Sequence, residues 1–158
     1  MTSLRFAAVL ATATMVTAVA TSALAVDGLV TKPSAHSVNA TIEKFEAAVK
    51  KRGFIVFTRL DHAAAAESVG LKMPRATVIV FGNPRLGTPV FLKTPTVAID
   101  LPPKAMVWQD SNGKVFLSYN SAQFLYGSIY VRHGVAADKA AAEKVEATLA
   151  AMAEEAVN

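Results

Sequence analysis

The fold is decided by the stretch at residues 77–89, which reads TVIVFGNPRLGTP. Its first five residues are apolar on both faces, a pattern typical of a strand inside a sheet. Glycine and proline then confine the backbone, so residues 82–89 are predicted to form a loop of defined geometry, and such loops often carry function. Thr88 as N-cap and Pro89 as first helical residue predict a short helix that ends before Pro95.

Upstream of this stretch, the sequence predicts a helix, a strand and a second helix. From the N-cap Ser37, apolar residues recur with helical spacing as far as Val49, and Gly53 stands where a left-handed C-terminal cap belongs. Residues 54–62 have the aromatic and β-branched content of a strand. Residues 63–69 can form a short helix that Gly70 ends.

Downstream, Asp110-Ser111-Asn112-Gly113 is the strongest hairpin signal in the chain, because strand-like segments at 105–108 and 114–119 flank it. Ser121 can cap a further helix through Tyr130. The Ala-rich tail at 136–156 reads as a helix with a thin apolar stripe that needs a surface to lie against. Before the first helix, residues 26–36 read as an extended lead-in.

The first 25 residues read as a secretory signal peptide, with charge at the start, an apolar run, and the cleavage pattern Ala23-Leu24-Ala25. An uncleaved membrane anchor is the alternative. We therefore expect an exported protein, periplasmic or secreted, with a single domain over residues 26–158 and no membrane contact after cleavage. The absence of cysteine from the chain excludes disulfides, thiolate metal sites and cysteine nucleophiles.

The charge pattern argues against nucleic acid as a partner. Removal of Arg5 with the signal peptide leaves 15 basic and 12 acidic residues, and the basic ones are scattered. The dense run Lys50-Lys51-Arg52 lies at the predicted C-terminus of a helix, where cations complement the helix dipole. A solvated helix end is therefore favoured over a nucleic-acid or anionic-membrane surface.

A longer series of motifs resembles one known family, the domain-of-unknown-function 302 family. The series, in order, is Leu60-Asp61-His62, Gly70-Leu71 with Pro74, Phe81-Gly82-Asn83-Pro84, Gly87-Thr88-Pro89, Asp100-Leu101-Pro102 with Lys104, Val107-Trp108, Gly113-Lys114-Val115 and Ser118-Tyr119-Asn120. The resemblance covers about residues 36–134. It implies an α+β fold: a two-layer α/β sandwich with a mainly antiparallel sheet, β-α-β-β-β-β-α order and an added C-terminal helix. It also implies a homodimer, and it supplies no activity.

Asp61 and His62 are the first candidates for chemistry. His62 could be a general base oriented by the neighbouring carboxylate, but adjacent residues on a strand point to opposite faces. The favoured interpretation is structural, with Asp61 capping the helix that follows. A metal site would require His62, His133 and a carboxylate such as Asp61 or Asp100 to converge; because no ligand spacing supports one, no metal or cofactor is predicted.

The loop at 82–89 and the segment after it supply the other candidates. Free amides at a helix N-terminus beside Arg85 could bind an anion, although turn formation also explains the glycines and prolines. Asp100 and Lys104 flank a Pro-Pro pair and could form an ion pair that holds the loop. Trp108 could line a pocket, but a lone strand Trp more often fills a core.

Two main classes of function remain. The preferred one is a non-catalytic binding module for a small anionic or metal-bearing ligand, held between the 82–89 loop and the end of the 54–62 strand, because no nucleophile–base or cofactor motif is present. Its predicted ligand-binding residues are Asp61, His62, Asn83, Arg85, Thr88, Asp100 and Lys104. The alternative is a small enzyme with His62 as acid/base and Asp100 and Lys104 as polar partners. A purely structural role is a third possibility.

Overall fold

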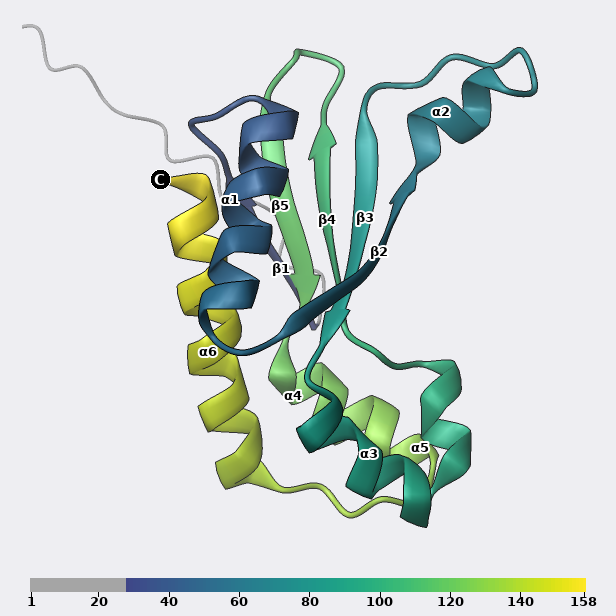
Figure 1. Ribbon diagram of the computed structural model, residues 1–158, viewed down its shortest axis with the longest axis vertical. Coiled ribbons are helices and arrows are strands. Elements are labelled where there is room, and N and C mark those ends of the chain that lie inside the picture. The colour runs from purple at the N-terminus through teal and green to yellow at the C-terminus, as the bar shows by residue number, and fades with distance from the viewer. Residues whose placement is uncertain (1–27) are drawn as a thin grey trace, which may run out of the picture.

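The computed structural model describes residues 28–158; the expected signal peptide, residues 1–25, lies outside this range. Five strands and two long helices make up the body of the domain (Figure 1). The elements are, in order, β1 (Leu29–Pro33), α1 (Val38–Lys51), β2 (Ile55–Asp61), α2 (His62–Glu67), β3 (Ala76–Gly82), α3 (Pro84–Lys93), a 3-10 helix (Pro95–Ile99), β4 (Lys104–Gln109), β5 (Val115–Asn120), α4 (Ala122–Phe124), a π-helical turn (Leu125–Ile129), α5 (Tyr130–Arg132) and α6 (Lys139–Val157).

Local signals explain the boundaries of the first helix. The Ser37 side chain accepts a hydrogen bond from the Ala40 amide, which satisfies one of the unpaired donors of the first turn. At the other end Gly53 has a φ of 73°, a left-handed conformation that glycine adopts without a Cβ clash. The predicted bounds of this helix are therefore confirmed.

The strands form one antiparallel sheet in the order β1-β5-β4-β3-β2. The expected lead-in at 26–36 contains β1, which pairs with β5. The predicted hairpin joins β4 to β5, and Gly113 in its turn has a φ of 83°. Counting β1, the strands and the two long helices follow the expected β-α-β-β-β-β-α order, so the fold class is confirmed.

Helices α1 and α6 lie side by side over one face of the sheet (Figure 1). The inward-facing residues Ile79, Phe81, Val107 and Leu117 are fully buried beneath them. On α6 the apolar stripe includes Leu149 and Met152 and packs into the same core, which supplies the surface that this thin stripe needs. No helix of the described part of the chain covers the opposite face of the sheet.

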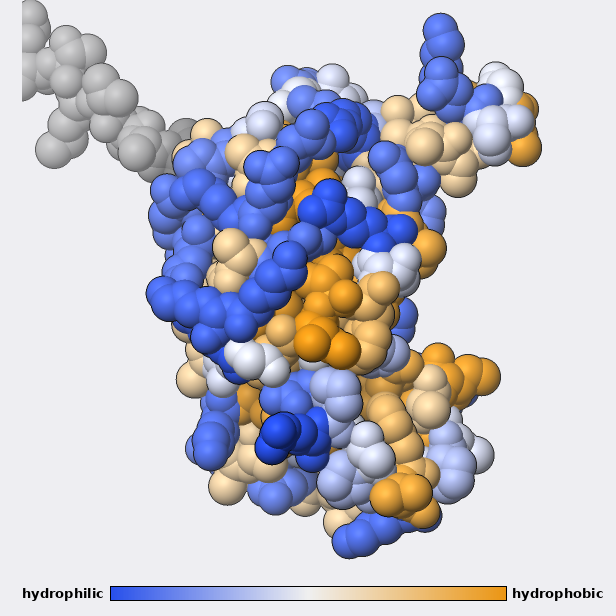
Figure 2. Space-filling view, viewed as in Figure 1, coloured by the Kyte–Doolittle hydropathy of each residue, from blue (hydrophilic) through white to orange (hydrophobic). Residues whose placement is uncertain are grey.

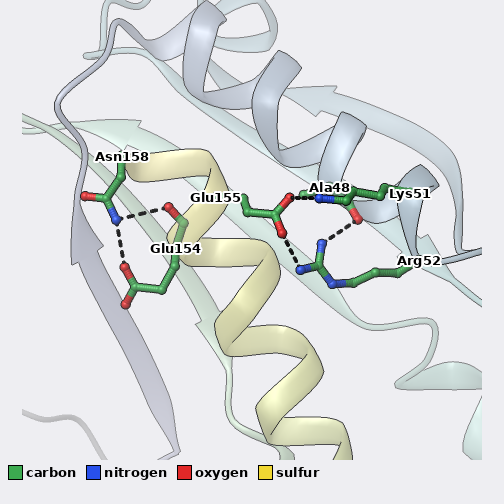
Figure 3. Close-up of polar contacts among 6 residues, drawn as sticks. All are labelled: Ala48, Lys51, Arg52, Glu154, Glu155 and Asn158. Carbon is green, nitrogen blue, oxygen red and sulfur yellow. Dashed lines mark hydrogen bonds and ion pairs between the residues drawn. The ribbon is translucent and has the colours of Figure 1, made fainter.

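Charged side chains join α1 to α6 near the C-terminus (Figure 3). Arg52 Nη2 lies 2.5 Å from Glu155 Oε1, and Lys51 Nζ lies 3.4 Å from Glu155 Oε2. Arg52 also donates a hydrogen bond to the Ala48 carbonyl, which is one of the unpaired acceptors at the end of α1. The basic run at 50–52 thus contributes to a contact between helices.

The segment at 82–89 differs from its prediction. Helix α3 begins at Pro84, five residues before Pro89, the expected first helical residue. The Asn83 side chain caps it by accepting a hydrogen bond from the Arg85 amide, and Pro89 lies inside the helix. Asn-Pro and Thr-Pro are equally good starts locally, and the earlier one continues directly from β3. Among residues 28–158, no helix is long and apolar enough to span a membrane.

Candidate functional site

The predicted site residues lie in separate places. Asp61 pairs with Thr77 at one end of the β2–β3 ladder, whereas Asn83 follows Gly82 at the other. Five residue steps along β3 separate the two ends, a distance of about 17 Å. The expected pocket between the 54–62 strand end and the 82–89 segment is therefore not assembled within residues 28–158.

At the first end, Asp61 is the N-cap of α2. Its Oδ1 accepts a hydrogen bond from the Ala64 amide at 3.1 Å, as the structural interpretation predicts. His62 is the first residue of α2 and is exposed, and no hydrogen bond joins it to Asp61. A hollow of about 510 Å³ lies beside Asp61 and is otherwise lined by α2 and the loop that follows it. The structure thus provides no oriented acid/base pair here.

At the other end, the three predicted residues belong to the start of α3. Asn83 uses its side-chain oxygen for the cap, and Arg85 and Thr88 are exposed on the helix itself. Gly82 allows a close approach: a Cβ at this position would lie 3.1 Å from Phe57 and 3.3 Å from Pro102. Gly82 is therefore explained by packing, and Pro84 by the start of the helix.

Asp100 takes part in a polar cluster that sequence reasoning did not assemble. His133 Nε2 lies 2.7 Å from Asp100 Oδ2, His133 Nδ1 lies 3.0 Å from Thr96 Oγ1, and Arg132 Nη1 lies 3.3 Å from Asp100 Oδ2. The His133 side chain is 8% exposed. The hydrogen bond from His133, followed by the charge of Arg132, lowers the pKa of Asp100 below its ordinary value.

This cluster has the order hydroxyl, imidazole, carboxylate, which in hydrolases activates a nucleophile. However, neither of the two hollows described here is lined by Thr96 or His133. The cluster joins the 3-10 helix to the end of α5, so its evident role is to hold these two segments together.

Lys104 does not form the expected ion pair with the Asp100 carboxylate. Its Nζ donates instead to the backbone carbonyls of Asp100 at 3.0 Å and Pro102 at 3.1 Å. The lysine thereby closes the loop that leads into β4. Its side chain also borders a hollow of about 250 Å³ on the uncovered face of the sheet.

This second hollow lies over the centre of the sheet. Its floor includes Val78, Met106 and Trp108 from neighbouring strands, and all three are half-buried. The Trp108 Nε1 donates to Ser118 Oγ at 2.9 Å, and Ser118 Oγ lies 2.8 Å from Thr31 Oγ1. The indole ring stacks on Phe116 with ring centroids 4.7 Å apart. Trp108 therefore does not fill the main core: it is held rigidly in a surface hollow with its N–H satisfied.

Further apolar side chains are exposed along β2. Figure 2 shows an apolar area there, beside the polar outer surface of α1. Ile55, Phe57 and Leu60 are each between 44% and 49% exposed. Exposed apolar side chains are therefore also present on β2, at the edge of the sheet.

Comparisons with known proteins identify the family to which this chain belongs. The model for "Domain of unknown function DUF302" matches residues 30–156. The chain belongs to the DUF302 family. The match covers the sheet and both long helices except for the end residues Leu29 and Val157, so all residues that line the sheet-face hollow except Leu29 belong to the DUF302 domain.

One solved DUF302 structure and two curated proteins are similar to this DUF302 chain. The crystal structure of an uncharacterised conserved DUF302 protein from Bacillus stearothermophilus has a TM-score of 0.68 and 24% identity, covering 82% of this chain and 98% of that one. Fluoride-specific ion channel FluC 1 of Brucella suis and FluC 2 of Brucella melitensis are each 46% identical over 98 residues, 62% of this chain. The chain covers 39% and 36% of these two relatives.

Sequence reasoning named Lys104 as a site residue but missed most of the sheet-face hollow. The available signal was alternation, because Lys104, Met106 and Trp108 share one face of their strand while Ser118 and Asn120 share a face of theirs. Which of the two faces remains uncovered depends on where the helices pack. Helix packing involves residues that are far apart in the sequence, so no local pattern predicts it.

Proposed function

We propose that this DUF302 chain is a non-catalytic binding module whose binding surface is the uncovered face of the sheet around Trp108. One observation carries the proposal: Val78, Met106 and Trp108 are neighbours on the same face of the sheet and are half-buried, and no helix of residues 28–158 covers them. Contiguous apolar surface of this kind commonly marks a binding site. Export directed by the expected signal peptide would place this module outside the cytosol.

Several features favour binding over catalysis. Asp61 and Asn83 are used as helix caps, and His62 has no partner to orient it within residues 28–158. A general base must come within hydrogen-bond reach of the proton that it removes from a bound substrate. The imidazole that is oriented, His133, borders neither hollow.

The test uses Trp108, the single tryptophan of the chain, as an intrinsic reporter. Titration with the neutral probe 1-octanol is expected to shift Trp108 fluorescence saturably. The variant Met106→Glu places a charge in the hollow and is expected to abolish the shift while far-UV circular dichroism stays unchanged, because Met106 is only half-buried.

The matched control is Met73→Glu, at a methionine that is 43% exposed and outside the hollow. This variant should respond to 1-octanol as the wild-type protein does. A wild-type protein whose Trp108 emission does not respond to 1-octanol would show that the hollow is not a binding site.

The curated relatives favour a second candidate function. They are named fluoride-specific ion channels, and the chain covers less than two fifths of their length. We propose that this DUF302 chain assists a separate channel of that kind. Deletion of the chain in its native host is then expected to lower the fluoride concentration that halts growth, with rescue by the wild-type gene. Equal fluoride tolerance in both strains would exclude this role.

A further inference from the structure

The sheet-face hollow is polar at one end and apolar at the other. Lys104 on β4 and Asn120 on the neighbouring strand β5 lie in the same row across the sheet. Met106 and Ser118 form the next such row, and Trp108 and Phe116 form the row after that. Lys104 and Trp108 are separated by four residue steps, about 13 Å along the strand. A ligand lying along β4 would therefore meet a cation at one end and an aromatic ring at the other.

The charge at the polar end is positive. Among residues 28–158, Lys104 is the only charged residue that lines the hollow. Two of its three N–H groups donate to the carbonyls of Asp100 and Pro102, and within residues 28–158 no acceptor is found for the third. The carboxylate of Asp100 is engaged by His133 and Arg132, so it does not neutralise the ammonium group directly.

Asn120 adds a second polar group next to this ammonium. Its side chain is exposed and lines the hollow, and a side-chain amide can donate to an anion. Between this end and Trp108, Val78 and Met106 present apolar atoms and a thioether, and the hydroxyl groups of Ser118 and Thr31 in the same row bond to one another. The volume of about 250 Å³ lies below the ~300–1,000 Å³ of sites for drug-sized ligands, which favours a short ligand.

From these observations we propose that the hollow binds small amphiphilic carboxylates, with the carboxylate at Lys104 and Asn120 and the apolar chain along Met106 towards Trp108. The inference rests on the proposed binding function of this same hollow, and it specifies the ligand class. Burial of each methylene contributes about 0.8 kcal/mol, so the chain provides affinity and the charge provides selectivity.

The experiment compares three probes of equal chain length by Trp108 fluorescence: octanoate, octylammonium and 1-octanol. Octanoate is expected to bind most tightly and octylammonium most weakly. The variant Lys104→Met is expected to weaken octanoate binding about fivefold, as for loss of a partly exposed ion pair, and to leave 1-octanol binding unchanged.

The matched control is Lys44→Met, which removes the same charge from the exposed surface of α1, on the far side of the sheet. It should not alter octanoate affinity. Because Lys104 also binds two carbonyls, the thermal midpoint of each variant is measured, and Lys104→Arg, which keeps the charge, should retain most of the octanoate preference.

The two proposals fail in different ways. If 1-octanol binds but octanoate binds no better than octylammonium, the carboxylate class is wrong and the binding function stands. If Lys44→Met and Lys104→Met weaken octanoate equally, long-range net charge and not the hollow is responsible, and the ligand class is again overturned. If none of the three probes changes Trp108 emission, both proposals are wrong.

Discussion

The Asp100 carboxylate lies in a polar cluster that joins the 3-10 helix to the end of α5. Instead of pairing with Lys104, it accepts a hydrogen bond from a His133 ring that is almost fully buried. His133 lies 33 residues further along the chain, and the contact depends on how α5 packs against the 3-10 helix. Because the hydrogen bond and the nearby cations favour the ionised form, the pKa of Asp100 is lowered in the folded state.

This lowered pKa predicts a specific dependence of stability on pH. Ionised Asp100 contributes stability above its unfolded pKa, about 4, and the contribution disappears as the pH falls through the lower folded value. The difference in thermal midpoint between the wild-type protein and Asp100→Asn should therefore be full at pH 6 and shrink towards pH 2. Differential scanning fluorimetry across this range measures it.

A matched control for this prediction is Glu67→Gln. Glu67 is exposed on α2 and has no ion pair within the described part of the chain. Its variant should follow the wild-type midpoint at every pH. A constant difference between wild type and Asp100→Asn from pH 6 to pH 2 would contradict the assigned role of Asp100.

At the scale of elements, the two strands of the hairpin, β4 and β5, are interior to the sheet, because β1 pairs with β5 and β3 with β4. The edges are β1 and β2. Of these, β2 carries the exposed residues Ile55, Phe57 and Leu60, and an exposed apolar edge tends to associate.

We therefore predict that the protein forms a homodimer through β2. Sedimentation velocity at micromolar concentration should show a dimer for the wild-type protein and a monomer for Leu60→Lys, since a charge on an edge strand opposes pairing. The control Leu92→Lys, at a side chain on α3 that is 79% exposed, should remain dimeric. A wild-type protein that sediments only as a monomer at tens of micromolar would refute the prediction.

At the scale of the whole molecule, the two faces of the sheet are unequal. The main buried core, which includes Phe45, Phe81, Leu117 and Met152, lies between the sheet and the layer of α1 and α6. The other face keeps Trp108 and its neighbours at the surface, where Trp108 and Ser118 are fixed by hydrogen bonds. The main core and the proposed binding surface thus lie on opposite sides of one sheet.

Several parts of this arrangement follow from the sequence, because they depend on interactions within a few residues. Ser37 and Gly53 set the ends of α1, and the turn at 110–113 sets the register of β4 against β5. Asp61 was interpreted as a helix cap, and it is one. The fold class follows from the order of these elements together with the family resemblance.

The rest was decided only by tertiary structure. Asn83-Pro84 and Thr88-Pro89 are equivalent helix starts locally, and the continuation from β3 into α3 selected the first. The His133–Asp100 contact joins residues 33 positions apart along the chain, so no local spacing encodes it. Alternation placed Met106 and Trp108 on one face of their strand, but the packing of α1 and α6 on the other face left that surface open. Interactions between nearby residues therefore determined the helices and strands, and the packing of α1 and α6 on one face of the sheet determined where the proposed binding site lies.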